Sequence, residues 1–393
     1  MRVLNRAAAL AVGAALAAAM WSCGSAAAPG PAPPAPVTSR AFLHVLDLKG
    51  DVFHTYEVVA ETGRLRSTST TPAEGASAAG ADPHDRMLLV WVLGKGTDKI
   101  PSSSNILRSY TVDPGNGTLV PAAEQRTSER PVGVHEWYPA ALTLSRDRVF
   151  LWGSYMGVGY DDYGYLHGYE RRTDGAWVDA TQPQVVFGED YLDAVYASPA
   201  ASRVYLISGS SYFGSRLAAN VPGADGSYNQ QGPAMDLSQP AQTGFDAAFD
   251  VTAGAVVGEH LVLAGVHAPN GLRMTQLATF RVDDATGQLR GETLYPDDIV
   301  DRGTRLIGAS NDQLAEIGNS GVHLFRLDAS GALTLTGKIQ DAVTGGAAFH
   351  PSGEFLYFCS GGGLWTYRLS GGSWSPFAFD PGVPPGQIVL TAG

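Results

Sequence analysis

The residues best suited to acid–base chemistry lie together in the segment RPVGVHEWYPAAL, which begins at Arg130. His135 and Glu136 are neighbours there, and a carboxylate close to a histidine can orient the imidazole as a general base. Arg130 could hold a carboxylate or phosphate, because its guanidinium is planar and always charged. The segment therefore predicts a catalytic group of Arg130, His135 and Glu136. The competing interpretation is a solvated rim of a structural protein.

Aromatic residues and carboxylates in other segments offer binding groups. The segment Tyr155–Glu170 is rich in tyrosine and glycine, a composition that gives adaptable contacts and suits sugars. GEDYLDAV and YPDDIVDRGTRL add acids and arginines, whose oxygens could alternatively bind calcium or only solvate an acidic surface. The predicted ligand-binding residues are Trp137, Tyr155, Tyr160, Tyr163, Glu189, Asp190, Asp193, Asp298, Asp301 and Arg302.

Motifs for a cofactor or a known nucleophile are absent. The sequence contains no G-x-S-x-G, H-E-x-x-H, C-x-x-C, Walker or EF-hand pattern, and DPGNG and DASG are predicted to be turns. No cofactor and no metal is therefore predicted. The net charge of −12, without a run of Lys or Arg, argues against a nucleic-acid partner. Cys359 lies in an apolar segment and is predicted to be buried and inert.

The N-terminal segment predicts export and attachment to a membrane. Residues 1–22 combine two arginines with a short apolar run, which is typical of a signal peptide. The segment MWSC resembles a bacterial lipobox, so Cys23 is predicted to be lipidated; cleavage near Ala26–Ala28 is the alternative. The Pro- and Ala-rich residues 23–40 predict a semi-extended tether. We therefore expect a lipoprotein of the bacterial cell envelope with its folded domain over residues 41–393.

A unit with an aromatic residue and a glycine turn recurs through this domain. YTVDPGNGTL, FRVDDATGQL and YRLSGGSW are three copies, and the copies found begin at Tyr56, Tyr110, Tyr169, Phe280, Phe325 and Tyr367. The long interval between the third and fourth copies predicts a hidden copy between Tyr205 and Tyr228. Apolar segments such as EFLYFCSG precede the copies and predict strands buried on both faces.

Seven such units predict an all-β, seven-bladed β-propeller of four-stranded blades. The first unit lacks an inner strand, so we expect the C-terminal strand, Ile388–Thr391, to pair with the first blade and close the ring. A pair of β-sandwiches or a six-bladed ring is the alternative. Loops into the inner strands share one face of a propeller, where His135 and His267 fall. His84, His260 and His350 fall in or near the short turns of the opposite face and are predicted to be structural. The histidines expected within strands are His44, His54, His167 and His323.

The repeating unit resembles the lactonase-type seven-bladed propellers, which include the propeller 6-phosphogluconolactonases and YVTN-type surface propellers. The best matches are Phe349–Tyr367, Phe280–Leu289 and Tyr110–Leu119, and the resemblance covers about residues 41–393. It implies a site at the mouth of the central channel, where enzymes of this family tend to use His, Arg and Glu. It also implies either opening of a lactone or binding without a reaction.

Two functions remain open at this point. The first is an exported, membrane-tethered binding or scaffold module that uses one acidic, tyrosine-rich face and acts as a monomer on a small molecule, glycan or protein. The second is a lactone hydrolase that uses His135 and nearby carboxylates. Export favours the first, because sugar-phosphate lactones belong to metabolism inside the cell.

Overall fold

The computed structural model describes most of the predicted folded domain. The described residues are 40–47, 51–81, 86–92, 106–126, 136–145, 148–156, 162–172, 177–179, 184–187, 191–198, 203–209, 215–223, 227–267, 274–283, 286–295, 305–309, 312–318, 321–340 and 343–393. They belong to one compact unit, Thr38–Gly393. The predicted signal peptide, Cys23 and the tether up to residue 39 lie outside the described residues.

The described residues form seven separate antiparallel sheets, most of them four-stranded. In the first three, the strands are β1 (Ala41–Asp47), β2 (Val52–Val58), β3 (Leu65–Pro72) and β30 (Gly386–Ala392); β4 (Ala76–Ala81), β5 (Met87–Val92), β6 (Ile106–Val112) and β7 (Leu119–Arg126); and β8 (Glu136–Ser145), β9 (Arg148–Met156), β10 (Asp162–Arg171), β11 (Trp177–Asp179) and β12 (Gln184–Phe187).

The remaining four sheets follow the same plan. They contain β13 (Tyr191–Ala197), β14 (Val204–Gly209), β15 (Arg216–Pro222), β16 (Tyr228–Gln230) and β17 (Met235–Asp236); β18 (Phe249–Val257), β19 (His260–His267), β20 (Met274–Val282) and β21 (Leu289–Leu294); β22 (Arg305–Ala309), β23 (Gln313–Gly318), β24 (Gly321–Leu327) and β25 (Leu333–Ile339); and β26 (Val343–Phe349), β27 (Phe355–Ser360), β28 (Gly363–Ser370) and β29 (Ser373–Pro381). The short helix α2 (Pro240–Thr243) precedes β18.

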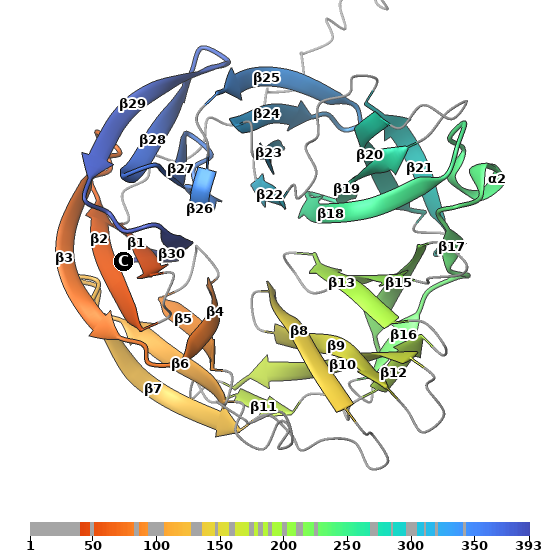
Figure 1. Cartoon of the computed structure of the whole chain (residues 1–393), viewed down its shortest axis with the longest axis horizontal. Helices are drawn as coiled ribbons and strands as arrows, with labels where there is room; N and C mark the ends of the chain where they lie inside the picture. The colour runs from red at the N-terminus through yellow and green to blue at the C-terminus, as the bar shows by residue number, and fades with distance from the viewer. Residues whose placement is uncertain are drawn as a thin grey trace, which may run out of the picture. The chain divides into compact units, whose positions relative to one another are not determined.

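The sheets are arranged as the blades of an all-β propeller around a central opening (Figure 1). The innermost strands contact one another in the cyclic order β30, β4, β8, β13, β18, β22, β26 and back to β30. Backbone hydrogen-bond ladders join strands only within a sheet, so no ladder closes the ring from blade to blade among the described residues. Neighbouring blades instead meet through buried side chains, in clusters that each draw on two or more sheets. In the described part of the chain, no helix is long and apolar enough to span a membrane.

The C-terminal strand β30 is the inner strand of the first sheet. It pairs with β1 along its whole length, from Gly386 opposite Asp47 to Ala392 opposite Ala41. The side-chain amide of Gln387 then reaches the second sheet: its Nε2 donates to the backbone oxygen of Ala79 at 2.6 Å, and its Oε1 accepts from the backbone nitrogen of Ala79 at 3.0 Å. One residue of β30 thus joins the first two inner strands.

The recurring aromatic residue lies on the third strand of its blade, immediately after a β-bulge. Register shifts separate Thr55 from Tyr56, Ser109 from Tyr110 and Thr279 from Phe280. In several blades this aromatic faces a leucine of the second strand; Tyr110, for example, faces Leu88. The rings are buried, so the repeated sequence unit supplies the core of each blade.

The fourth blade shows why one copy was hidden in the sequence. Its third strand has Ala219 at the position of the aromatic residue, and the register partner of Ala219 on the second strand is Tyr205. The aromatic residue and the small residue have exchanged strands. The blade core is therefore filled, although the recurring sequence pattern is absent from the third strand. Tyr228, the other limit of the predicted copy, lies on the fourth strand β16.

The glycine of the recurring turn contacts the preceding blade. Gly117 has a φ of +73°, and a Cβ added to it would lie 2.3 Å from Cδ1 of Phe42 on β1. Gly63 has a φ of +60°, and a Cβ added to it would lie 2.6 Å from Cε1 of Phe355 on β27. The glycine is therefore required twice, by the left-handed backbone and by the neighbouring ring.

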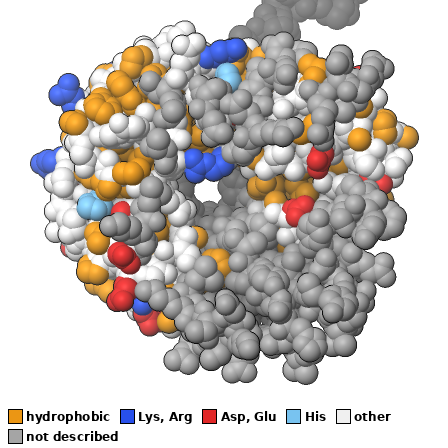
Figure 2. Space-filling view, viewed as in Figure 1, with side chains coloured by type: hydrophobic (Ala, Val, Ile, Leu, Met, Phe, Trp, Pro, Cys, Tyr) orange, Lys and Arg blue, Asp and Glu red, His pale blue; other side chains and the backbone are white. Residues whose placement is uncertain are grey.

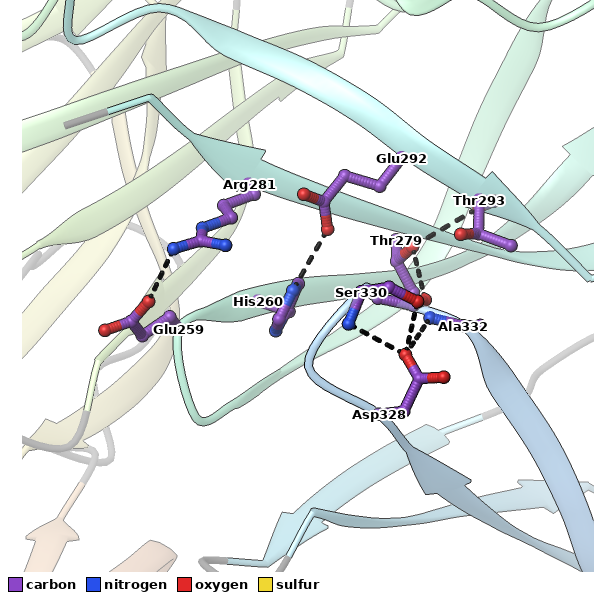
Figure 3. A network of polar contacts seen from close by, with 10 residues as sticks. Glu259, His260, Thr279, Arg281, Glu292, Thr293, Asp328, Ser330 and Ala332 are labelled. Carbon is purple, nitrogen blue, oxygen red and sulfur yellow. Dashed lines mark hydrogen bonds and ion pairs between the residues drawn. The ribbon is translucent and has the colours of Figure 1, made fainter. Parts of the chain in front are cut away.

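An aspartate closes several of these turns, as predicted for DPGNG and DASG. Asp113 Oδ1 accepts from the backbone nitrogens of Gly115 and Asn116, and Asp328 Oδ1 accepts from those of Ser330 and Ala332. Figure 3 shows the second turn beside the fifth blade, where the Thr279 hydroxyl donates to the backbone oxygen of Gly331 at 2.9 Å. The carboxylates are thus used by the fold, which confirms that these segments are turns.

Replacing Gln387 by alanine should destabilise the ring. The substitution removes two hydrogen bonds and leaves both backbone groups of Ala79 without them, which costs about 1–3 kcal/mol. Chemical denaturation of residues 41–393 should show a lower midpoint with an unchanged slope. Gln340 is exposed and lies on no strand, so Gln340→Ala is the matched control. Equal stability of the two variants would contradict the role given to Gln387.

Replacing Gly117 by alanine should cost more stability than replacing Gly258. Both glycines have positive φ, +73° and +59°, but a Cβ on Gly258 would meet nothing within 4 Å. Gly258→Ala therefore measures backbone strain alone, roughly 1–2 kcal/mol, and Gly117→Ala adds the clash with Phe42, roughly another 1–3 kcal/mol. Thermal unfolding of both variants measures the difference, and equal losses would show that the blade contact is unimportant.

Candidate functional site

The inner strands all begin at one end of the ring, which we call the channel mouth. Within each sheet, successive strands are antiparallel and lie progressively further from the centre. After four strands the chain is again at the end of the ring where the inner strand began. The next inner strand therefore begins at that same end. The hairpins between second and third strands also lie there, whereas the glycine turns described above lie at the opposite end.

Four consecutive inner strands carry an ionisable residue in their first three positions. These are Glu136 on β8, Asp193 on β13, Asp250 on β18 and Arg305 on β22. Figure 2 shows the central opening with basic side chains on one side of it and acidic side chains on another. The fold thus gathers three acids and one base at the channel mouth from segments more than 160 residues apart in sequence.

Asp193 has the electrostatic setting of a proton-transfer group. Burial of its carboxyl group, followed by the nearby Asp250 carboxylate on the next inner strand, raises the pKa of Asp193 to about 6, although the residue as a whole remains exposed. Three residues further along β13, the ring of Tyr196 packs against Gly254 of β18. A Cβ added to Gly254 would lie 2.7 Å from this ring. A carboxyl group that titrates near neutral pH can act as a general acid or base.

Arg305 provides the positive group of the mouth. Its Nη2 atom donates to the backbone oxygen of Gly345 on β26, which holds the guanidinium against the seventh blade. A guanidinium has five N–H donors and this bond uses one of them. Other N–H groups could donate to an anionic or carbonyl oxygen of a ligand. Burial raises the pKa of the Cys359 thiol. The positive charge of Arg305 lies close enough to Cys359 to offset part of this increase. Cys359 is a buried free cysteine, as predicted.

Three of the predicted aromatic residues share one row of the third sheet. Trp137 on β8 is the register partner of Tyr155 on β9, and Tyr155 is the partner of Tyr163 on β10. Glu136 precedes Trp137 and pairs with Met156. The row lies where β8 begins, so it belongs to the channel mouth.

The other predicted site residues lie outside the described residues. This applies to Arg130, His135, Tyr160, Glu189, Asp190, Asp298, Asp301 and Arg302, so the catalytic group of Arg130, His135 and Glu136 stays a prediction. Within the described residues, no group of three His, Cys, Asp or Glu side chains could hold a metal ion. His44 lies within a strand, as predicted. It is buried with one ring nitrogen bonded to Thr55 and the other to Thr391, and burial lowers its pKa to about 3.

Asp250 was not predicted as a site residue from the sequence. It lies in GFDAAFDV, at the end of the long insertion of the fourth blade, where no recurring unit marked the next inner strand. The available signal was the similarity of FDV to the segment LDAV around Asp193, since both place an aspartate within a short apolar strand.

Solved structures with the same architecture support the fold. A protein from Lactobacillus plantarum is 14% identical, covers 90% of this chain and 99% of its own, and superposes with a TM-score of 0.61. Candidate 6-phosphogluconolactonases from Bacteroides fragilis (14% identity, 92% and 99% coverage, TM-score 0.59) and Bacteroides uniformis (13%, 90% and 99%, TM-score 0.59) are similarly related. No protein-family model and no curated protein matches the chain. At these identities, the comparisons show a β-propeller fold.

Replacing Asp193 by asparagine should flatten part of the dependence of stability on pH. The pKa of Asp193 in the folded protein, about 6, lies above the value of roughly 3.9 expected for an unfolded chain, so folding is favoured by protonation. The wild type should therefore gain stability relative to Asp193→Asn as pH falls from about 7 to 4. Melting temperatures of both proteins across this range test it, and a constant difference would rule out the raised pKa.

Proposed function

We propose that the protein is an exported, membrane-tethered seven-bladed propeller that binds a ligand at its channel mouth. The anchor rests on the signal-like residues 1–22, Cys23 and the tether. Cyclic contacts among the seven inner strands and the pairing of β30 with β1 support the blade count. The folded domain would then stand clear of a membrane in the bacterial cell envelope, with one face free for its ligand.

The observation that carries this proposal is the convergence of Glu136, Asp193, Asp250 and Arg305 on the starts of consecutive inner strands. Core packing does not require acids at Asp193 and Asp250, because other residues of β13 and β18 form the buried clusters there. Like charges on neighbouring strands, as in Asp193 and Asp250, cost stability unless a ligand or proton offsets them. A binding site explains why they are present.

The chemistry of the mouth suits a glycan, with amino sugars favoured. Carboxylates accept hydrogen bonds from sugar hydroxyls and attract an ammonium group. Tryptophan and tyrosine have flat apolar faces with a polar edge, which suit a sugar ring, and the row of Trp137, Tyr155 and Tyr163 lies beside Glu136.

Lactone hydrolysis is the second candidate. It is supported by the likeness in fold to candidate 6-phosphogluconolactonases and by the pKa of about 6 of Asp193. In this function His135 would act as general base, oriented by Glu136, and Arg130 would hold an anionic group of the substrate.

A glycan array probed with residues 41–393 tests the binding function. We expect binding to at least one neutral or amino-sugar glycan, and a loss of about tenfold or more in affinity in Asp250→Asn and in Trp137→Ala, because each removes a charged or stacking contact. Glu354→Gln is the control, since Glu354 is exposed in a turn at the opposite end of the ring. Absence of any glycan binding, or equal affinity of all variants, would exclude this role for the mouth.

A further inference from the structure

In the part of the chain that the structure describes, three buried oxygens at the junction of the seventh and first blades have no hydrogen-bond partner. They are Oη of Tyr357 on β27, Oγ1 of Thr366 on β28 and Oδ2 of Asp380 on β29. Tyr357 and Thr366 are completely buried. The two blades are described over residues 40–47, 51–72 and 343–393. Nearly all buried polar atoms of folded proteins are bonded, so three such oxygens in one junction require a common explanation.

The three oxygens belong to neighbouring positions on one face of the seventh sheet. Thr366 is the register partner of Tyr357 on one side and of Ala378 on the other, and Asp380 lies two residues beyond Ala378. Side chains at these positions share a face, because successive residues of a strand alternate. That face packs on the first blade, which lies beside the seventh in Figure 1. Asp380 also accepts a hydrogen bond from the backbone nitrogen of Leu65, the first residue of β3.

Electrostatics supports a site that these groups share. Burial, followed by the nearby Asp380 carboxylate, raises the pKa of Tyr357 above its usual range, so its hydroxyl keeps a proton to donate. Burial also raises the pKa of Asp380, and the charge of Arg64 and the Leu65 N–H oppose this increase. The Leu65 bond leaves the second carboxylate oxygen, Oδ2, in need of a donor, because an unpaired buried acceptor costs free energy.

The position of Tyr357 in the other blades shows that this arrangement is particular to the seventh. In each blade the equivalent residue lies on the second strand, directly after the residue that faces the third-strand aromatic or, in the fourth blade, Ala219. These residues are buried in all seven blades and are His44, Leu89, Phe150, Leu206, Val262, Ala315 and Tyr357. Apart from Tyr357, only His44 is polar, and both of its ring nitrogens are bonded to threonines.

The hydroxyls at the position of Thr366 are bonded in the other blades that have one there. Thr55 is bonded to a histidine at 3.0 Å, Ser109 donates to a backbone oxygen of the fourth strand at 3.3 Å, and Thr279 donates to a backbone oxygen of the sixth blade at 2.9 Å. Thr366 thus occupies a position where the fold elsewhere satisfies a hydroxyl directly, and it lies opposite the hydroxyl-bearing Tyr357.

We propose that the junction of the seventh and first blades binds an internal water molecule, which joins Oδ2 of Asp380 to the hydroxyls of Tyr357 and Thr366. Water can donate to the carboxylate, and hydroxyls can both donate and accept. A buried water typically makes about three hydrogen bonds to groups that have no other partner. A calcium ion fits less well, because it takes six to eight oxygen ligands and Arg64 already places a positive charge near this carboxylate. The site does not depend on the function proposed for the channel mouth.

Removing one hydroxyl gives opposite results with and without the water. With the water bound, Tyr357→Phe and Thr366→Val each leave it with a bond unmade, and each should lower the melting temperature by about 1–3 °C. The double variant should lose less than the sum of the two, because both substitutions act on one water. If the hydroxyls have no partner, their removal relieves an unpaired buried group. An unchanged or raised melting temperature in both single variants would therefore overturn the proposal.

Thr279→Val is the matched control, since it removes a directly bonded hydroxyl from the same position of the fifth blade. It should lower the melting temperature, and its effect should add to that of Tyr357→Phe because the two sites share no partner. Additive losses in Tyr357→Phe and Thr366→Val, like those of this control pair, would contradict a shared water.

A high-resolution crystal structure of the wild type identifies the occupant even if a variant does not fold. We expect density for a water at about 2.5–3.2 Å from each of the three oxygens. Crystals grown in rubidium chloride separate water from a monovalent cation, because an anomalous signal at this position would show a cation and overturn the proposal. Absence of density there, or direct hydrogen bonds among the three side chains, would overturn it as well.

Discussion

The pairing of β30 with β1 is the interaction on which the rest of the ring depends. Each blade buries its faces against two neighbours, so every blade needs a complete blade on either side. Among the sheets of the described residues, only the first takes strands from both ends of the domain. Gln387 extends that join to the second inner strand. Without this contact the first blade would present an unpaired strand edge to solvent, and the two clusters of buried side chains that include Ile388, Val389 and Leu390 would be opened.

Much of the fold could be predicted because each recurring residue has a defined structural cause. The aromatic residue fills the blade core after a bulge. The glycine allows a left-handed turn against an aromatic side chain of the preceding blade, and the aspartate caps that turn. The fourth blade shows the limit of this approach, since Tyr205 and Ala219 fill the same space from exchanged strands. A volume can be conserved across a pair of strands while the pattern along either strand disappears.

The candidate site was less predictable, because it depends on which strand ends meet in space. Asp193 could be predicted from its acidic segment, whereas Asp250 follows an insertion that interrupted the count of units.

The first sheet combines strands from the beginning and the end of the domain, so it cannot be completed until the last strand has been synthesised. Val45 and its partner Ile388 are separated by 388 − 45 = 343 positions in the chain. At a synthesis rate of about 5–20 residues per second, β1 to β3 wait roughly 20–70 seconds for their inner strand. A topology with such distant pairing folds slowly. Until β30 is made, β1 therefore has an unpaired edge, which is the kind of strand edge that can pair with another chain.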